Sequence, residues 1–134
     1  MNVVGWRELF HFPELKLVNI PGKIDTGAWS NVLHCDEINL VDGKLNVKIG
    51  NNNYVFDKYK TIDVKSSFGE EQCRWSIITP VLLGNKEYKL QISLNNREKM
   101  KYPLLIGRRF LQKFKYIVDV NKECVNINDH FKKI

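Results

Sequence analysis

Short apolar runs, rich in β-branched and aromatic residues, dominate the chain, and polar turn residues separate them at short intervals. This pattern predicts many short β-strands, because such side chains fit the pleated, half-buried surface of a sheet. The runs cover residues 15–20, 38–41, 45–49, 54–56, 61–64, 74–83, 87–94, 104–106, 116–120 and 124–127. Pairs such as Asp42-Gly43 and Gly84-Asn85, which suit positive φ angles or side-chain turn bonds, mark turns between them.

The clearest predicted hairpin joins residues 76–83 to residues 86–94 through Gly84-Asn85. Its second arm alternates between apolar and polar residues, as a strand with one buried face does. The apolar face would carry Tyr88, Leu90, Ile92 and Leu94, and the polar face Glu87, Lys89, Gln91 and Ser93.

One helix is predicted, over residues 108–114, where Phe110, Leu111 and Phe114 recur at helical spacing after Gly107. Many short strands with a single short helix in the C-terminal part indicate an all-β fold. We expect a mainly antiparallel sheet or a small barrel.

Length and composition narrow the class of protein. The 134 residues suit a single domain, 1–134, and 43% hydrophobic residues suffice for a packed core. With 27% charged residues and no apolar run near the roughly 18 residues of a spanning helix, no membrane segment is expected. The N-terminus lacks the apolar core of a secretory signal, so the chain reads as cytoplasmic, although a mature form without its leader would look the same.

The net charge of +6 raises the question of a polyanionic partner. The lysines are scattered, however, and no basic helix, zinc-finger spacing or aromatic ribonucleoprotein motif is present, so nucleic-acid binding is the less favoured expectation. Cys35, Cys73 and Cys124 are odd in number and too far apart for a C-x-x-C site, which argues against a disulfide framework.

Candidate chemistry centres on the segment from Lys23 to Ala28, where an apolar strand leads into Asp25, Thr26 and Gly27. This order can turn the chain sharply and present the carboxylate at the turn. Alone, the triplet is also compatible with an ordinary turn that begins at Asp25. A second element adds weight: Leu104-Leu105-Ile106-Gly107 is an apolar strand that ends in glycine and passes directly into the predicted helix.

The two elements together resemble one lobe of an aspartic peptidase of the retropepsin type. The likeness extends almost end to end to the bacterial and archaeal retropepsin-like family that carries the label ATP-dependent zinc protease. The matching segments are Gly5-Trp6-Arg7-Glu8, Pro13-Glu14-Leu15, Lys23 to Ala28, Ser30, Leu33-His34, Val64 to Glu70, Arg74, Asn96-Arg97, Met100 and Leu104 to Leu111.

The resemblance implies a closed acid-protease barrel and a catalytic pair made of Asp25 from two identical subunits, because the chain holds one Asp-Thr-Gly. A homodimer acting on peptide or protein substrates is therefore expected. Thr26 would lock the two loops across the axis, and Gly27 would let the substrate backbone approach. Residues 64–73, centred on Ser67, Phe68 and Gly69, would form a flap, although a simple exposed turn fits as well. The resemblance also implies substrate contacts from Ala28, Trp29 and Ile106, with Gly107 and Arg108 structural near the site.

Two features depart from this picture. Trp29 stands where retropepsins have the acidic partner of Arg108, so Arg108 lacks its expected ion pair, and Trp29 is open to a role in a pocket, a subunit contact or the core. Neither zinc nor ATP is supported, because there is no H-E-x-x-H or phosphate-binding loop and His11, His34 and His130 lie far apart. The pair His34-Cys35 is expected to pack beside the acid-bearing turn.

No cofactor or metal is therefore expected, and the leading interpretation is an aspartic endopeptidase. The alternative is a noncatalytic member that keeps the barrel as a peptide-binding or assembly module. A third reading, nucleic-acid binding through the basic surface, predicts a steep dependence of binding on salt concentration.

Overall fold

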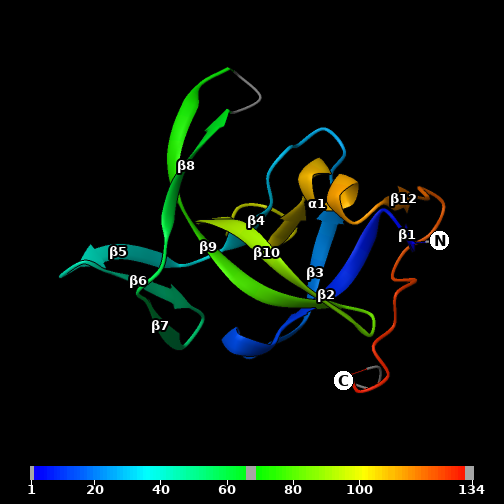
Figure 1. Cartoon of the computed structure of the whole chain (residues 1–134), viewed down its shortest axis with the longest axis horizontal. Coiled ribbons are helices and arrows are strands. Elements are labelled where there is room, and N and C mark those ends of the chain that lie inside the picture. Colours follow the sequence, from blue (N-terminus) through cyan, green and yellow to red (C-terminus); the bar gives the residue numbers. More distant parts are fainter. Residues whose placement is uncertain (1, 66–68, 132–134) are drawn as a thin grey trace.

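Six strands close into a barrel in the computed structural model of the chain, which describes residues 2–65 and 69–131. The strands are β2 (Arg7–Phe12), β3 (Leu17–Ile24), β4 (Val32–His34), β9 (Glu71–Leu83), β10 (Lys86–Asn95) and β11 (Leu104–Ile106). They are paired in the order β10-β4-β11-β3-β2-β9, and β9 pairs back with β10 to complete the ring (Figure 1). The expected all-β barrel is confirmed.

The barrel is mixed, because β10 with β4 and β11 with β3 run parallel while its other pairs are antiparallel. The remaining strands lie outside the ring: β1 (Asn2–Val4), β5 (Glu37–Val41), β6 (Lys44–Ile49), β7 (Asn52–Phe56), β8 (Lys60–Lys65) and β12 (Tyr116–Val118). Strands β5, β6 and β7 form a small sheet of their own, β1 pairs with β12 in parallel, and β8 pairs with β9. Figure 1 shows the β8–β9 hairpin projecting away from the barrel.

Two short helices complete the fold, the 3₁₀ helix η1 (Pro13–Leu15) and the α-helix α1 (Arg108–Lys113). The α-helix confirms the prediction to within one residue. Phe110 and Leu111 are its buried positions, and the ring of Phe110 packs edge-on to Tyr88 of β10 and stacks with Tyr116 of β12. These aromatic contacts fix α1 against the end of the barrel.

The strand predicted over residues 124–127 is absent from the structure. Cys124 has a positive φ of 50°, and the amides of Val125 and Asn126 donate to the carboxylate of Glu8 instead of to a neighbouring strand. The strands β1, β2 and β4 were not predicted. Because β1 and β4 have only three residues each, they show no alternation from which a strand could be recognised.

The core lies inside the barrel and consists of side chains from nearly every element. Phe10, Ile92 and Ile106 are fully buried there. Ser93, expected on the polar face of its strand, is also buried, and its hydroxyl donates to the carbonyl oxygen of Asn31 at 3.1 Å. Among the helices of the described residues, none has both the length and the apolar character that crossing a membrane requires.

Candidate active site at the Asp25 turn

Asp25 begins a tight turn directly after β3. Its amide donates to the carbonyl oxygen of Ile106 at 2.8 Å, which continues the pairing of β3 with β11 by one residue. Its carboxylate oxygen Oδ1 accepts the amide of Gly27 at 2.9 Å, and its carbonyl oxygen accepts the amide of Ala28 at 3.2 Å. The carboxyl group is thus held by the turn it starts, with Thr26 and Gly27 exposed beside it.

Gly107 lets β11 pass closely beside this turn. A Cβ atom at Gly107 would lie 2.6 Å from the carbonyl oxygens of both Trp29 and Ser30, so no larger residue fits without moving backbone. The amides that follow, of Arg108 and Arg109, donate to the carbonyl oxygens of Ala28 and Trp29 at 2.8 and 3.1 Å. The loop from β3 to β4 is therefore bonded to both β11 and the start of α1, and Figure 1 shows it beside that helix.

Asn31 is a buried residue that connects this loop to the barrel. Its Oδ1 accepts the amide of Gly107 at 3.0 Å, and its Nδ2 donates to the carbonyl oxygen of Gln91 at 3.1 Å. Its own carbonyl oxygen accepts the amide and the hydroxyl of Ser93. The sequence pattern alone did not assign a role to Asn31. The feature that could have pointed to it is an amide residue placed just before the apolar pair Val32-Leu33.

Arg108 contacts a backbone oxygen and an aromatic ring instead of an acidic side chain. Its Nη1 donates to the carbonyl oxygen of Thr26 at 2.8 Å, and its guanidinium carbon lies 5.9 Å from the centre of the Trp29 ring. Trp29 is 52% exposed, which excludes the core position considered for it. A cation–π contact thus stands where retropepsins have an ion pair, and it leaves the indole available at the surface beside Asp25.

The segment expected to form a flap is the far end of the β8–β9 hairpin. The pairing of Val64 with Gln72 extends β8 and β9 out to this tip, and Gly69 has a φ of +82°. Ser67 and Phe68, predicted as substrate contacts, lie outside the described residues. Ile106 is fully buried, so its side chain belongs to the core and its backbone holds Asp25.

Arg97 and Arg74 are two arginines without an assigned role, and the charge of Arg97 interacts with the charges of Arg74 and Asp25. Burial lowers the pKa of the Arg97 guanidinium, the charge of Arg74 lowers it further, and the charge of Asp25 acts in the opposite direction. Burial also lowers the pKa of Arg74. Both residues were part of the matching segments, but nothing in the sequence showed that they come together.

His34 positions Arg97 from the end of β4. Its Nδ1 accepts the amide of Arg97 at 2.8 Å, while its Nε2 lies 3.1 Å from Oδ1 of Asp36. Hydrogen bonding from the amide of Gly50, and then from His34, lowers the pKa of Asp36. Cys35 is buried, as expected for packing, and burial raises the pKa of its thiol to about 11. Within residues 2–65 and 69–131, no three His, Cys, Asp or Glu side chains gather as a metal site requires.

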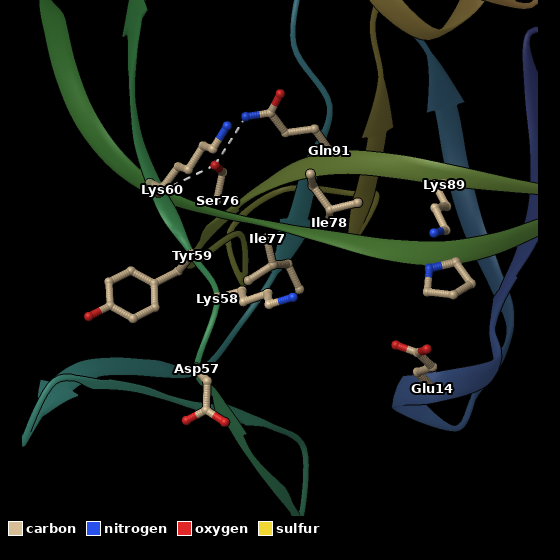
Figure 2. A pocket seen from close by; sticks show the side chains of 11 residues that line it. Glu14, Asp57, Lys58, Tyr59, Lys60, Ser76, Ile77, Ile78, Lys89 and Gln91 are labelled. Atoms are coloured by element: carbon tan, nitrogen blue, oxygen red, sulfur yellow. Dashed lines mark hydrogen bonds between the residues drawn. The ribbon is translucent and has the colours of Figure 1, made fainter.

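A cavity of about 610 Å³ opens on another part of the barrel surface. Figure 2 shows its wall, where Gln91 Nε2 donates to the hydroxyl of Ser76, which in turn donates to the carbonyl oxygen of Lys60. Its lining includes two isoleucines and three lysines, and none of its residues belongs to the Asp25 turn. Gln91 lines the cavity and also contacts the candidate site, because its carbonyl oxygen accepts the Nδ2 group of Asn31.

Comparison with known proteins places this geometry in context. A protein of Desulfotalea psychrophila named "Probable alpha-L-glutamate ligase" is 28% identical to this chain over 92% of its length. A protein of Shewanella pealeana with the same name is 25% identical over 87% of this chain. The matched region is 29% and 28% of these relatives, so the chain spans less than a third of their length.

A crystal structure of a Legionella pneumophila protein of unknown function (DUF785) shares the fold, with a TM-score of 0.71 and 24% sequence identity. The match covers 93% of this chain and 98% of the Legionella chain. A family model described as "Retropepsin-like aspartic endopeptidase RimB" matches residues 3–129. The match includes the Asp25 turn, the β8–β9 hairpin and the β11-to-α1 crossing. The chain therefore belongs to the RimB-like family of retropepsin-like proteins.

Proposed function

We propose that this protein is an aspartic endopeptidase whose catalytic pair is Asp25 from each of two identical subunits. The observation that carries the proposal is the Asp25 turn itself: its carboxylate is oriented by the Gly27 amide and its backbone is bonded to β11 and α1. Such bracing fixes a carboxylate in position, which catalysis by a pair of acids requires. A single Asp25 turn per chain calls for a second subunit.

The chemistry needs one carboxylate and one carboxylic acid. Two Asp25 side chains about 3 Å apart across a two-fold axis cannot both ionise, so the pair holds one proton between them. The ionised member takes a proton from water as the water oxygen attacks the peptide carbonyl carbon, and the other member gives its proton to the carbonyl oxygen. Transfer of a proton to the amide nitrogen then lets the C–N bond break, which yields a carboxylic acid and an amine.

The surroundings of Asp25 supply the remaining parts in this proposal. Thr26 and Gly27 are exposed at the turn, where the hydroxyl can meet the partner loop and the glycine leaves room for a substrate backbone. The exposed indole of Trp29 offers a contact surface at the same place. The β8–β9 hairpin covers an extended peptide bound next to Asp25 and excludes bulk solvent, while the attacking water stays between the two carboxyl groups.

The names of the relatives support glutamate-rich peptides as the substrate. A segment equivalent to this chain forms less than a third of proteins named as α-L-glutamate ligases. A peptidase linked to an enzyme that joins glutamate residues would act on the chains which that enzyme makes. The net charge of +6 supports the same class, because a basic protein attracts an acidic peptide.

Cleavage of quenched fluorescent glutamate-rich peptides tests the function. We expect Asp25→Asn to lower kcat/KM by about 1,000-fold or more, because the pair then lacks a carboxylate that can change protonation state. Asp42→Asn is the matched control, since Asp42 lies in the exposed turn between β5 and β6 and its φ of 51° suits asparagine equally. Equal cleavage by wild type and Asp25→Asn would refute the proposal.

The native mass tests the shared site separately. Light scattering across protein concentration should reveal a species of twice 15.7 kDa that accounts for the activity. Cleavage by a strict monomer would contradict the catalytic pair. A dimer that binds these peptides with and without Asp25→Asn, yet never cleaves them, would instead favour the noncatalytic peptide-binding module.

A further inference from the structure

Arg74, inside β9, and Arg97, just after the end of β10, are brought together by the pairing of these two strands. In the antiparallel ladder of β9 and β10, Ser76 lies opposite Ser93. Continuing this register by two residues brings Arg74 level with Asn95, the last residue of β10, and Arg97 follows two positions later. The charge of Arg74 lowers the pKa of the Arg97 guanidinium, which agrees with this placement.

Neither guanidinium forms an ion pair with another of the described residues. Arg97 donates from Nε to the carbonyl oxygen of Tyr102 at 3.1 Å, and Arg74 donates from Nη2 to the side-chain oxygen of Gln72 at 2.9 Å. Both acceptors are uncharged. In the part of the chain that the structure describes, neither arginine has a carboxylate within ion-pair distance. The Nε of Arg74 is buried without any hydrogen-bond partner, an arrangement that costs free energy unless a ligand supplies an acceptor.

The charge of Asp25 does not balance this pair. In the proposed dimer, two subunits bring four of these guanidinium groups, whereas the two Asp25 side chains share one proton and so carry one negative charge. The positive charge in excess is partly removed from water, because both arginines are only partly exposed. A planar guanidinium fork with free donors matches a carboxylate more closely than any other common group of a peptide.

We propose that Arg74 and Arg97 together form the subsite that binds a side-chain carboxylate of the substrate next to the bond that is cleaved. The inference rests on the proposed peptidase function and assigns its specificity to two named residues. His34 acts on this subsite as a positioning residue, because its Nδ1 holds the backbone of Arg97. Arg74 lies on β9, which is one of the two strands of the hairpin proposed as the flap.

The test compares two peptides that differ only in charge, one with glutamate residues in an alanine and serine background and one with glutamine in their places. For the wild type we expect a kcat/KM at least tenfold higher for the glutamate peptide. Arg97→Gln and Arg74→Gln should each reduce this ratio, and the double variant should bring it close to one. Lys113→Gln, which removes an exposed charge of α1, is the control and should leave the ratio unchanged.

Arg97→Lys separates charge from geometry. It keeps the positive charge but loses the planar fork, so we expect an intermediate ratio. Thermal unfolding of each variant without peptide controls for folding. Because Arg74 and Arg97 repel each other and lack acidic partners, Arg74→Gln should unfold at no lower temperature than the wild type. A ratio that is the same in the double variant as in the wild type would overturn the proposal.

A binding measurement keeps this inference distinct from the peptidase function. Titration of Asp25→Asn with the glutamate peptide should give a dissociation constant that rises at least tenfold when Arg74→Gln and Arg97→Gln are added. If the wild type cleaves nothing but this binding pattern holds, the peptidase proposal fails and the carboxylate subsite stands. If cleavage occurs without any preference for glutamate, the peptidase proposal stands and the subsite fails. Binding that is equally tight with and without the arginines would likewise overturn it.

Discussion

At the residue scale, the site depends on two glycines whose missing side chains serve different purposes. A Cβ atom on Gly107 would meet backbone oxygens at 2.6 Å, whereas one on Gly27 would meet only the side-chain oxygen of Asp25, at 3.2 Å. Backbone held by hydrogen bonds on both sides cannot yield easily, but a carboxyl group can rotate. Replacing the first glycine therefore affects the fold, and replacing the second affects the catalytic group.

We predict that Gly107→Ala lowers the free energy of unfolding by about 2 kcal/mol or more, because the crossing of β11 past the Asp25 turn would have to open. Gly27→Ala should cost less than about 1 kcal/mol of stability yet reduce kcat/KM by about 100-fold, through the displaced carboxylate. Urea unfolding and peptide cleavage on both variants measure the contrast. Equal losses of stability in the two variants would contradict it.

Residues with local roles could be predicted from the sequence, and residues with distant partners could not. Asp25 and Gly27 contact each other within one turn, so their order alone suggested the geometry. Asn31 acts through Gly107, which is 76 positions away, and Arg97 is recognised as part of a site only once β9 and β10 are paired. A single sequence carries no record of such pairings, which is why these residues received no role.

At the element scale, one buried carboxylate of the barrel accepts two backbone amides of the segment after β12. Glu8 lies on β2 with no exposed surface, and it accepts the amides of Gly5, Val125 and Asn126 at 2.7, 3.2 and 3.0 Å. These bonds replace the strand pairing predicted for residues 124–127. The strand prediction for these residues was wrong because an acceptor from outside the segment satisfies the amides of Val125 and Asn126.

Glu8→Gln should lower the free energy of unfolding by about 2–4 kcal/mol, because an amide nitrogen cannot accept a backbone N–H and leaves one buried donor unpaired. Limited proteolysis should then cut between residues 119 and 131 faster than in the wild type. Glu123→Gln serves as control, since its contact with Arg7 is an exposed ion pair of 3.7 Å that contributes little. Comparable destabilisation by both substitutions would refute this account of Glu8.

At the scale of the whole molecule, two side chains set how the fold responds to acid. His11 is buried, its Nδ1 accepts the amide of Asn19, and burial lowers its pKa below the usual value. The unfolded chain therefore binds a proton at His11 before the folded one does, so stability falls as the pH drops below about 6.5. The lowered pKa of Asp36 acts at more acidic pH, where its stabilising bonds are lost as it gains a proton.

We predict that the melting temperature is nearly constant above pH 6.5 and decreases steadily between pH 6.5 and 5, which favours activity near neutral pH. His11→Gln should flatten this decrease, because the residue can no longer take up a proton, although the loss of the His11 acceptor lowers stability at every pH. His130→Gln, at an exposed position, is the control. A wild-type melting temperature that does not change across this range would contradict the prediction.

The closed ring also limits how copies of the chain can associate by strand pairing. Each of the six barrel strands has a paired neighbour on both sides, but only over part of its length. In the described residues, the unpaired edges include those of the β8–β9 hairpin, the β5–β7 sheet and the β1–β12 pair, and the stretch of β10 before Ser93, where pairing with β4 begins. Lys60 and Lys65 on β8, and Asn52 and Asn53 on β7, are poor partners for a new strand. Ring closure thus shortens the unpaired edge that a chain this rich in strands presents, and the edges that remain are left for contacts that its side chains select.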